Sequence, residues 1–317
     1  MSAVDDEIGA LFEAKNPRGL ARAISRSEEG RGAALMERFF ERTGRAITIG
    51  ITGPPGVGKS TLCAALVVAA RREGKTVGVI SVDPSSPFSH GAILGDRIRL
   101  AEHFTDPDVF IRSMASHGHL GGLAGATGDA VAFMDAFGKD VIVIETVGVG
   151  QSEIEIAELA DTTAVVLQPG SGDSIQLLKA GILEVADIFV VNKSDHPAAL
   201  QLQREIRSML EMLDLRGRVP ELVATQAREN VGTDALWEAI GRHDAYLRAT
   251  GELERKRRSA FAHRVRALVL GALERRVEVQ LNALREPAGA TQGDPYRAAA
   301  HLLERIDGEV PAGLLAP

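Results

Sequence analysis

Residues 53–60 have the composition of a loop that binds phosphate. They match the pattern G-x-x-x-x-G-K-[ST], directly follow the apolar run AITIGI at 46–51 and precede the helical segment STLCAALVVAARR. Glycines in such a loop let backbone N–H groups turn toward phosphate, and the helix N-terminus adds partial positive charge. Lys59 would reach the β- and γ-phosphates, and the Ser60 hydroxyl would bind Mg²⁺. The expected nucleotide-binding residues are Gly53, Pro54, Pro55, Gly56, Val57, Gly58, Lys59, Ser60 and Thr61.

A second motif, Asn192-Lys193-Ser194-Asp195, follows the apolar run DIFVVN and has the N-K-x-D form that binds guanine. The Asp195 carboxylate would accept hydrogen bonds from the ring N–H and the exocyclic amine of guanine. Adenine presents an acceptor at the ring position, and leaving that acceptor against a carboxylate costs about 1–3 kcal/mol. Thr225-Gln226-Ala227, after the next strand-like run, would complete the base pocket through backbone N–H groups. Together these motifs predict binding of GTP or GDP with Mg²⁺.

Three acidic residues lie between the two motifs. Asp83 closes the run TVGVISV, Glu145 closes DVIVIE, and Asp96 lies in GAILGDRIRL. Carboxylates at the carboxyl ends of parallel strands, beside a phosphate loop, are placed to hold Mg²⁺ or its waters. The alternative is that each acid caps a helix or lies solvated in a loop. Glu145-Thr146-Val147-Gly148 is similar to a D-x-x-G switch segment, in which Gly148 would donate its backbone N–H to the γ-phosphate.

The apolar runs predict an α/β fold. From about residue 46 to 225, β-branched runs alternate with helical patterns. Continuous apolar strands are buried on both faces, which indicates a P-loop NTPase with a mostly parallel central sheet flanked by helices, and ligands at the carboxyl ends of its strands. The expected strands, about seven in number, are 46–51, 76–82, 109–113, 140–146, 162–168, 187–192 and 221–226.

Both ends of the chain lack strand-like runs and predict helices. We expect an N-terminal helical extension at 1–45, a P-loop GTPase domain at 46–250 and a C-terminal helical arm at 251–317. An apolar stripe in the arm follows helical spacing and must be buried against something. Two alternatives stay open: packing on the central domain, or exchange across a homodimer interface. The stripe consists of Phe261, Val265, Leu268, Val269, Ala272 and Val279.

Composition argues against several kinds of partner. The net charge is −7 and only 4% of the residues are aromatic, so a nucleic-acid partner is not expected. No run approaches the roughly 20 apolar residues of a membrane span, and the acidic first residues lack a leader pattern. The single cysteine, Cys63, cannot form an intramolecular disulfide, which fits a reducing compartment. These features predict a cytoplasmic protein.

The central region closely resembles the MeaB/MMAA/ArgK GTPases, chaperones of adenosylcobalamin-dependent acyl-CoA mutases. The resemblance covers about residues 46–240 and rests on strings that include GITGPPGVGKSTL, VDPSSPFSHGAILGDRIRL, IETVGVGQSEIEIAELAD and LQPGSGDSIQLLKAGILEVADIFVVNKSD.

The resemblance implies roles for single residues. Lys59, Asp96, Glu145 and Lys179 would be catalytic, with Asp96 in a nucleotide-dependent switch and Lys179 meeting nucleotide when the partner binds. Ser60, Asp83, Asp96 and Glu145 would serve the metal site, and the C-terminal helices would form a dimer arm. The chain has His90 where members usually have glycine and His117 where they usually have arginine.

The expected reaction is transfer of the γ-phosphoryl group of GTP to water. No glutamine directly follows the switch glycine, although Gln151 is near, so slow intrinsic hydrolysis is expected until a mutase supplies or orders missing groups. Hydrolysis would then gate the loading, protection or reactivation of adenosylcobalamin on that mutase. The alternatives are a GTP-dependent metal-insertion protein, which should carry a Cys/His cluster, a P-loop small-molecule kinase, which would normally use ATP, and a transport-associated ATPase.

Overall fold

The computed structural model describes residues 2–84, 105–116, 124–146, 152–171, 185–212 and 218–285, and the single residues 103, 182, 299, 302 and 303. The chain divides into two compact units, Met1–Ala262 and His263–Pro317.

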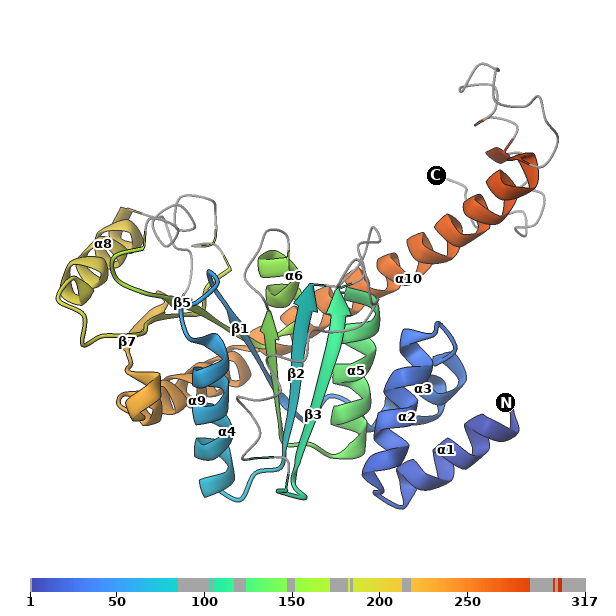
Figure 1. Ribbon diagram of the computed structural model, residues 1–317, viewed down its shortest axis with the longest axis horizontal. Coiled ribbons are helices and arrows are strands. Elements are labelled where there is room, and N and C mark those ends of the chain that lie inside the picture. Colours follow the sequence, from blue (N-terminus) through green and yellow to red (C-terminus); the bar gives the residue numbers. More distant parts are fainter. Residues whose placement is uncertain are drawn as a thin grey trace. The chain divides into compact units, whose positions relative to one another are not determined.

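A seven-stranded sheet forms the centre of the first unit, with the strand order β3-β2-β4-β1-β5-β6-β7 (Figure 1). Every neighbouring pair of strands is parallel. The predicted α/β fold is therefore confirmed, and each expected strand is present with its ends shifted by at most a few residues. The strands are β1 (Ile47–Thr52), β2 (Val77–Pro84), β3 (Val109–Ser116), β4 (Val141–Thr146), β5 (Thr162–Leu167), β6 (Ile188–Val191) and β7 (Glu221–Ala224).

Helices bury both faces of the sheet. On one face, α4 (Lys59–Arg72) and α9 (Thr233–Thr250) pack in a cluster with Val141 and Val143 of β4. On the other face, Ile142 and Ile144 of the same strand pack in a cluster with α5 (Ala124–Phe137) and α6 (Ser152–Leu159). Beside them, α8 (Ala199–Met212) covers β5 and β6. Successive side chains of a strand point to opposite faces, so these strands must be apolar throughout.

The N-terminal helices share the core of the sheet. They are α1 (Ala3–Glu13), α2 (Pro17–Glu28) and α3 (Ala33–Phe39), followed by the short η1 (Phe40–Arg42), and Figure 1 shows them stacked outside α5. The ring centroid of Phe12 lies 4.3 Å from that of Phe39 and 5.1 Å from that of Phe137. Hydrogen bonds from the side chain and backbone of Ser2 lower the pKa of Asp5 to about 2, as expected for a capping box.

The last long helix, α10 (Glu252–Arg285), follows η4 (Ala227–Glu229) and α9 in the chain. On the part of α10 that belongs to the second unit, large apolar side chains are exposed, and none of the described helices is long and apolar enough to cross a membrane. The exposed side chains are Val265, Leu268, Val269, Leu270, Val279 and Leu281.

A network of charges within the first unit ties the start of α10 to the amino ends of the strands. Arg257 donates to both carboxylate oxygens of Asp161, at 3.0 and 2.8 Å, and Asp161 in turn accepts from the backbone N–H of Thr48 at 3.0 Å. Lys256 donates to Asp187 at 2.9 Å, and His243 lies 3.3 Å from the other oxygen of that carboxylate. The helix is therefore fixed to the beginnings of β1 and β5.

We predict that Arg257→Gln lowers the free energy of unfolding by about 2–4 kcal/mol, because Asp161 is only 4% exposed and its buried carboxylate would lose its cationic partner. Urea unfolding of the full chain measures this. Arg255→Gln is the matched control, since Arg255 is exposed and binds Glu252 on its own helix. Equal losses in the two variants would contradict the role of Arg257.

A second prediction concerns acid stability. Burial alone would raise the pKa of Asp187, but its contacts with His243 and Lys256 outweigh burial and the pKa lies below its ordinary value. A carboxyl group with a lowered folded-state pKa stabilises the fold above its unfolded pKa of about 3.9. That contribution is lost as the pH falls further. Asp187→Asn should therefore flatten the dependence of unfolding free energy on pH below about pH 4, whereas Glu238→Gln on the exposed face of α9 should not.

Candidate functional site

The carboxyl ends of the central strands open into a cavity of about 710 Å³. This size suits a small organic ligand. The loop after β1, the ends of β2 and β4, and the segments after β6 and β7 form its wall. The cavity is lined by Pro55, Gly56, Gly58, Lys59, Ser60, Thr61, Ser81, Val82, Glu145, Thr146, Asn192, Lys193, Asp195, His196, Gln226, Ala227, Arg228 and Glu229.

The expected phosphate loop connects β1 to α4. Gly58 precedes the helix in a left-handed conformation, and Lys59 and Ser60 form its first turn. The Lys59 ammonium donates to the carbonyl oxygens of Gly53 at 2.7 Å and Pro54 at 2.9 Å. Its charge is therefore held over the loop, at the N-terminus of a helix, where anions are favoured.

Two glycines of the loop have no space for a side chain. At Gly53, where φ is +140°, a Cβ atom would lie 2.1 Å from the carbonyl oxygen of Val166 in β5. At Gly58, where φ is +97°, it would lie 2.4 Å from Nδ2 of Asn192. Both positions also have backbone angles that other residues rarely adopt. The loop is thus packed directly on the neighbouring strand and on the base motif.

Asn192 joins the phosphate loop to the segment after β7. Its side-chain Nδ2 donates to the carbonyl oxygen of Val57 at 2.8 Å. Its Oδ1 accepts from the hydroxyl of Thr225 at 3.1 Å and from the backbone N–H of Ala227 at 3.0 Å. The side chain is buried, at 3% exposure, so these bonds satisfy a polar group that cannot reach water. The amide fixes three separate loops in one arrangement.

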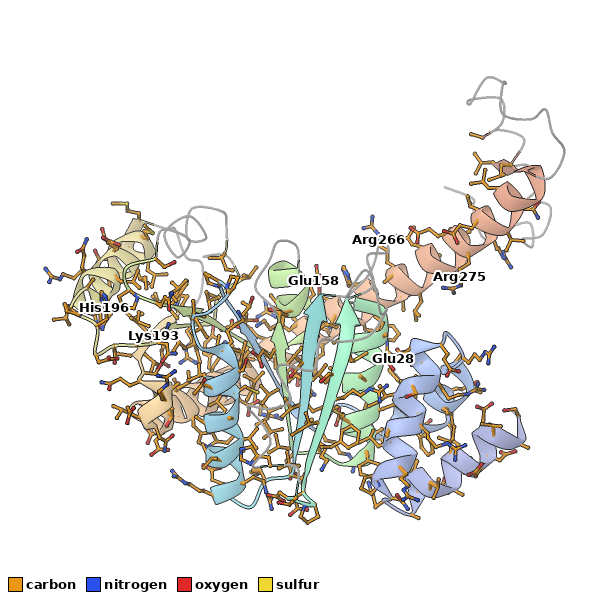
Figure 2. The ribbon with its side chains drawn as sticks, in the orientation of Figure 1. Glu28, Glu158, Lys193, His196, Arg266 and Arg275 are labelled. Atoms are coloured by element: carbon orange, nitrogen blue, oxygen red, sulfur yellow. The ribbon has the colours of Figure 1, made fainter. Side chains whose placement is uncertain are left out.

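Lys193 adds a second link to the phosphate loop. It has a left-handed φ of +55°, and its ammonium donates to the carbonyl oxygen of Gly56 at 3.0 Å and to Oε1 of Gln168. Asp195 is exposed and lines the same cavity. Figure 2 shows Lys193 and His196 on the loop between β6 and α8.

The backbone of Thr225-Gln226-Ala227 is used differently from our expectation. We expected its N–H groups to face the base, but each donates within the protein. That of Thr225 donates to Val191 at 2.9 Å, that of Gln226 to Val231 at 2.9 Å, and that of Ala227 to the Asn192 side chain. Gln226 and Ala227 nevertheless line the cavity.

Ser60 and Glu145 meet where a metal ion bound to phosphates would be placed. The Ser60 hydroxyl donates to Oε1 of Glu145 at 2.5 Å, and both residues are buried at the cavity wall. A hydroxyl and a carboxylate are the hard oxygen donors that suit Mg²⁺, which usually takes one or two carboxylates, waters and substrate phosphates. Asp83 occupies the end of β2, next to β4, but its side chain lies outside the described residues.

Cys63 lies close to this pair in α4. Burial, and then the negative charge of Glu145, raise the pKa of its thiol well above the ordinary value. A thiol with a raised pKa is a poor nucleophile and a poor metal ligand. Cys63 is therefore a small core residue. Among the described residues, no three His, Cys, Asp or Glu side chains gather as a metal-binding cluster.

Some expected site residues lie outside the described part of the chain: Asp96, Gly148 and Lys179, together with His90 and His117. Conversely, the cavity wall includes residues that we did not predict, namely Ser81, Val82, Thr146, His196, Arg228 and Glu229. The sequence indicates these residues only by their position, because each lies close in the chain to a motif or to the end of a strand.

The geometry brings together a phosphate loop, a hydroxyl and carboxylate pair, and a guanine-type motif in one cavity. The family described as Methylmalonyl Co-A mutase-associated GTPase MeaB matches residues 20–282. A Pyrococcus horikoshii protein provisionally named a GTPase is 43% identical over 312 residues, which cover 96% of this chain and 98% of that protein.

Two named relatives are more distant in sequence. GTPase ArgK of Escherichia coli is 36% identical over 78% of this chain and 73% of its own length. The Mus musculus protein named methylmalonic aciduria type A homolog, mitochondrial, is 36% identical over 72% of this chain and 56% of its own.

A crystal structure described as an LAO/AO transport system kinase superposes with a TM-score of 0.69 and 26% identity, covering 97% of this chain and 99% of that one. The match over residues 20–282 includes the phosphate loop, the base motif and all strands of the sheet. The chain therefore belongs to the MeaB family of P-loop GTPases and is related to ArgK and to the methylmalonic aciduria type A (MMAA) homolog.

Proposed function

We propose that the protein binds GTP with Mg²⁺, hydrolyses GTP to GDP and phosphate, and uses this cycle to gate the handling of adenosylcobalamin by an acyl-CoA mutase. The observation that carries the proposal is the Asn192 side chain, which binds Val57 of the phosphate loop and Ala227 of the base-side loop at once. A guanine nucleotide would span these two loops.

Guanine recognition in this proposal depends on Asp195. Its exposed carboxylate at the cavity wall would accept from the ring N–H and the exocyclic amine. The aliphatic part of Lys193 would lie along the base, because its ammonium is drawn toward Gly56 and Gln168. These two residues and Asn192 form the base side of the proposed site.

Phosphate binding depends on the other side of the cavity. The Lys59 ammonium would exchange its bonds to Gly53 and Pro54 for phosphate oxygens, since charge-assisted bonds to phosphate are stronger than bonds to neutral carbonyls. Ser60 and Glu145 would hold Mg²⁺, which neutralises charge on the phosphates. Asp83, Asp96, Gly148 and Lys179 are proposed to complete the metal site and the switch.

The mutase partner is proposed from the name of the matching family, which is described as associated with methylmalonyl-CoA mutase. The exposed apolar residues of α10 support a homodimer in which this helix is covered by a second copy, because clustered exposed apolar residues commonly mark an interface. Slow hydrolysis by the protein alone would then give the mutase control over the switch, as for GTPases that receive a catalytic group from a partner.

We predict that Asp195→Asn lowers kcat/KM for GTP by roughly 100-fold, because the amide cannot accept two hydrogen bonds from guanine. The same variant should gain activity with XTP, whose base has a carbonyl in place of the amine. Phosphate release from GTP, XTP and ATP measures the change. Asp234→Asn, on an exposed residue of α9, should behave as the wild type. Preference of the wild type for ATP would contradict the proposed base recognition and favour a kinase.

A further prediction concerns the partner. Phosphate release from GTP should accelerate by about one order of magnitude or more when an adenosylcobalamin-dependent acyl-CoA mutase is added, because one group supplied in trans can contribute that much to phosphoryl transfer. Lys59→Ala should abolish both rates. GTP selectivity without stimulation by any such mutase would retain the nucleotide site but contradict the chaperone role.

A further inference from the structure

A second cavity lies at the opposite end of the sheet from the nucleotide site. It has a volume of about 470 Å³ and is lined by Lys15, Arg42, Arg45, Asp135, Ala136, Gly138, Lys139 and Asp140. Arg45 comes just before β1, and Lys139 and Asp140 come just before β4. Its wall therefore belongs to the amino ends of the strands, and no residue of the GTP site contributes to it.

The carboxylates of this cavity are already engaged by donors of the protein. Asp135 accepts from the backbone N–H groups of Gly44 at 2.5 Å, Arg45 at 3.2 Å and Ala46 at 3.0 Å. Asp140 accepts from the backbone and hydroxyl of Thr76, at 2.8 and 2.9 Å. Neither carboxylate is within ion-pair distance of a wall cation, although the charges of Lys75 and Lys139 act on Asp140. These oxygens stabilise the turns before β1 and β2 by binding the backbone N–H groups there.

Lys15, Arg42 and Arg45 of the wall have fewer partners. Lys15 lies over the turn before β4, where its ammonium donates to the carbonyl oxygen of Phe137 and is 5.1 Å from the ring centroid of that residue. Arg42 is 3.8 Å from Glu13, whose closer partner is Arg38 at 2.9 Å. In the part of the chain that the structure describes, neither Lys15 nor Arg45 has an ion pair with a carboxylate.

The electrostatics of Lys15 agree with this picture. Burial, and then the positive charges of Arg42 and Arg45, lower its pKa below the ordinary value. Three cations therefore repel one another around one concavity. An anion placed among them would relieve the repulsion and would form charge-assisted hydrogen bonds with them.

We propose that this cavity binds the phosphate group of a small phosphorylated ligand through Lys15, Arg42 and Arg45. Arginine presents paired N–H donors that match phosphate oxygens, and two arginines beside one lysine suit an ion with two negative charges. The cavity is larger than a single phosphate group requires, so an organic phosphate fits as well as inorganic pyrophosphate. Lys139 is less accessible than Lys15, since it is only 6% exposed and its ammonium donates to the carbonyl oxygen of Asp108 at 2.7 Å.

The test is calorimetric titration of the full chain with inorganic pyrophosphate and, separately, with ribose 5-phosphate. The protein is first saturated with GDP in buffer without Mg²⁺, so that the phosphate loop is blocked and pyrophosphate has no free metal ion to chelate. We expect at least one probe to bind, and its affinity should fall at high ionic strength. Tighter binding of pyrophosphate would indicate a free inorganic anion as the ligand, and tighter binding of ribose 5-phosphate would indicate an organic phosphate. Absence of binding by both probes would overturn the proposal.

Substitutions locate the site. Arg45→Gln should weaken binding about tenfold, and Lys15→Gln combined with it should abolish binding, because each removes a direct cationic contact. Arg45 is exposed, so the single variant stays informative if the double variant fails to fold. Arg31→Gln is the matched control, since that exposed residue lies outside the cavity wall. GTP hydrolysis by Arg45→Gln should remain as in the wild type. Unchanged affinity in Arg45→Gln and in the double variant, or equal loss in Arg31→Gln, would overturn the assignment.

Discussion

Four carbonyl groups of the phosphate loop are held by side chains of the protein, and the rest of the site depends on these contacts. Lys59 binds the carbonyls of Gly53 and Pro54, Lys193 binds that of Gly56, and Asn192 binds that of Val57. The peptide units of the Gly56 and Val57 carbonyls carry the N–H groups of Val57 and Gly58, and fixing each carbonyl fixes its N–H as well, because the unit is planar. The units of the Gly53 and Pro54 carbonyls end in prolines and carry no N–H. The base motif thus orients the donors of the phosphate loop, in addition to the direct role proposed for it in base binding.

At the amino ends of the strands, carboxylates bind backbone N–H groups, whereas at the phosphate loop lysines and an asparagine bind carbonyl groups. Some backbone N–H groups at the beginnings of the strands donate to carboxylates rather than to backbone carbonyls, and buried N–H groups need such partners. Asp135 accepts from Ala46 before β1, Asp161 from Thr48, and Asp187 from Thr163 of β5. These carboxylates then attract Arg257 and Lys256, which fixes α10 to the same edge. Arg257 and Lys256 are thus paired with carboxylates at this end, whereas Lys15 and Arg45 have no ion pair in the described part of the chain.

Much of this arrangement is readable from the sequence, because the relevant signals are local. Continuous apolar runs predict buried parallel strands, and all seven are found. The phosphate loop and the N-K-x-D motif are short contiguous strings, and residues of both line the cavity at the carboxyl ends of the strands. Ser60 and Glu145 were both expected to serve the metal site, and they meet because the loop after β1 leads to Ser60 while Glu145 lies in β4, the strand beside β1. Residue spacing is therefore sufficient to predict a binding element when all of its residues belong to one strand or one loop.

What the sequence did not indicate depends on contacts between distant segments. The burial of Asn192 against Ala227 redirects the N–H groups that were expected to face the base, and nothing in either string reveals that competition. The cavity at the amino ends gathers Lys15, Arg45 and Lys139 from three turns that share no motif. Whether a cation has a carboxylate partner depends on whether the nearby carboxylates already bind other donors. Asp135, for example, accepts from three backbone N–H groups. Unmatched charge is a property of the packed chain, and only a structure can locate it.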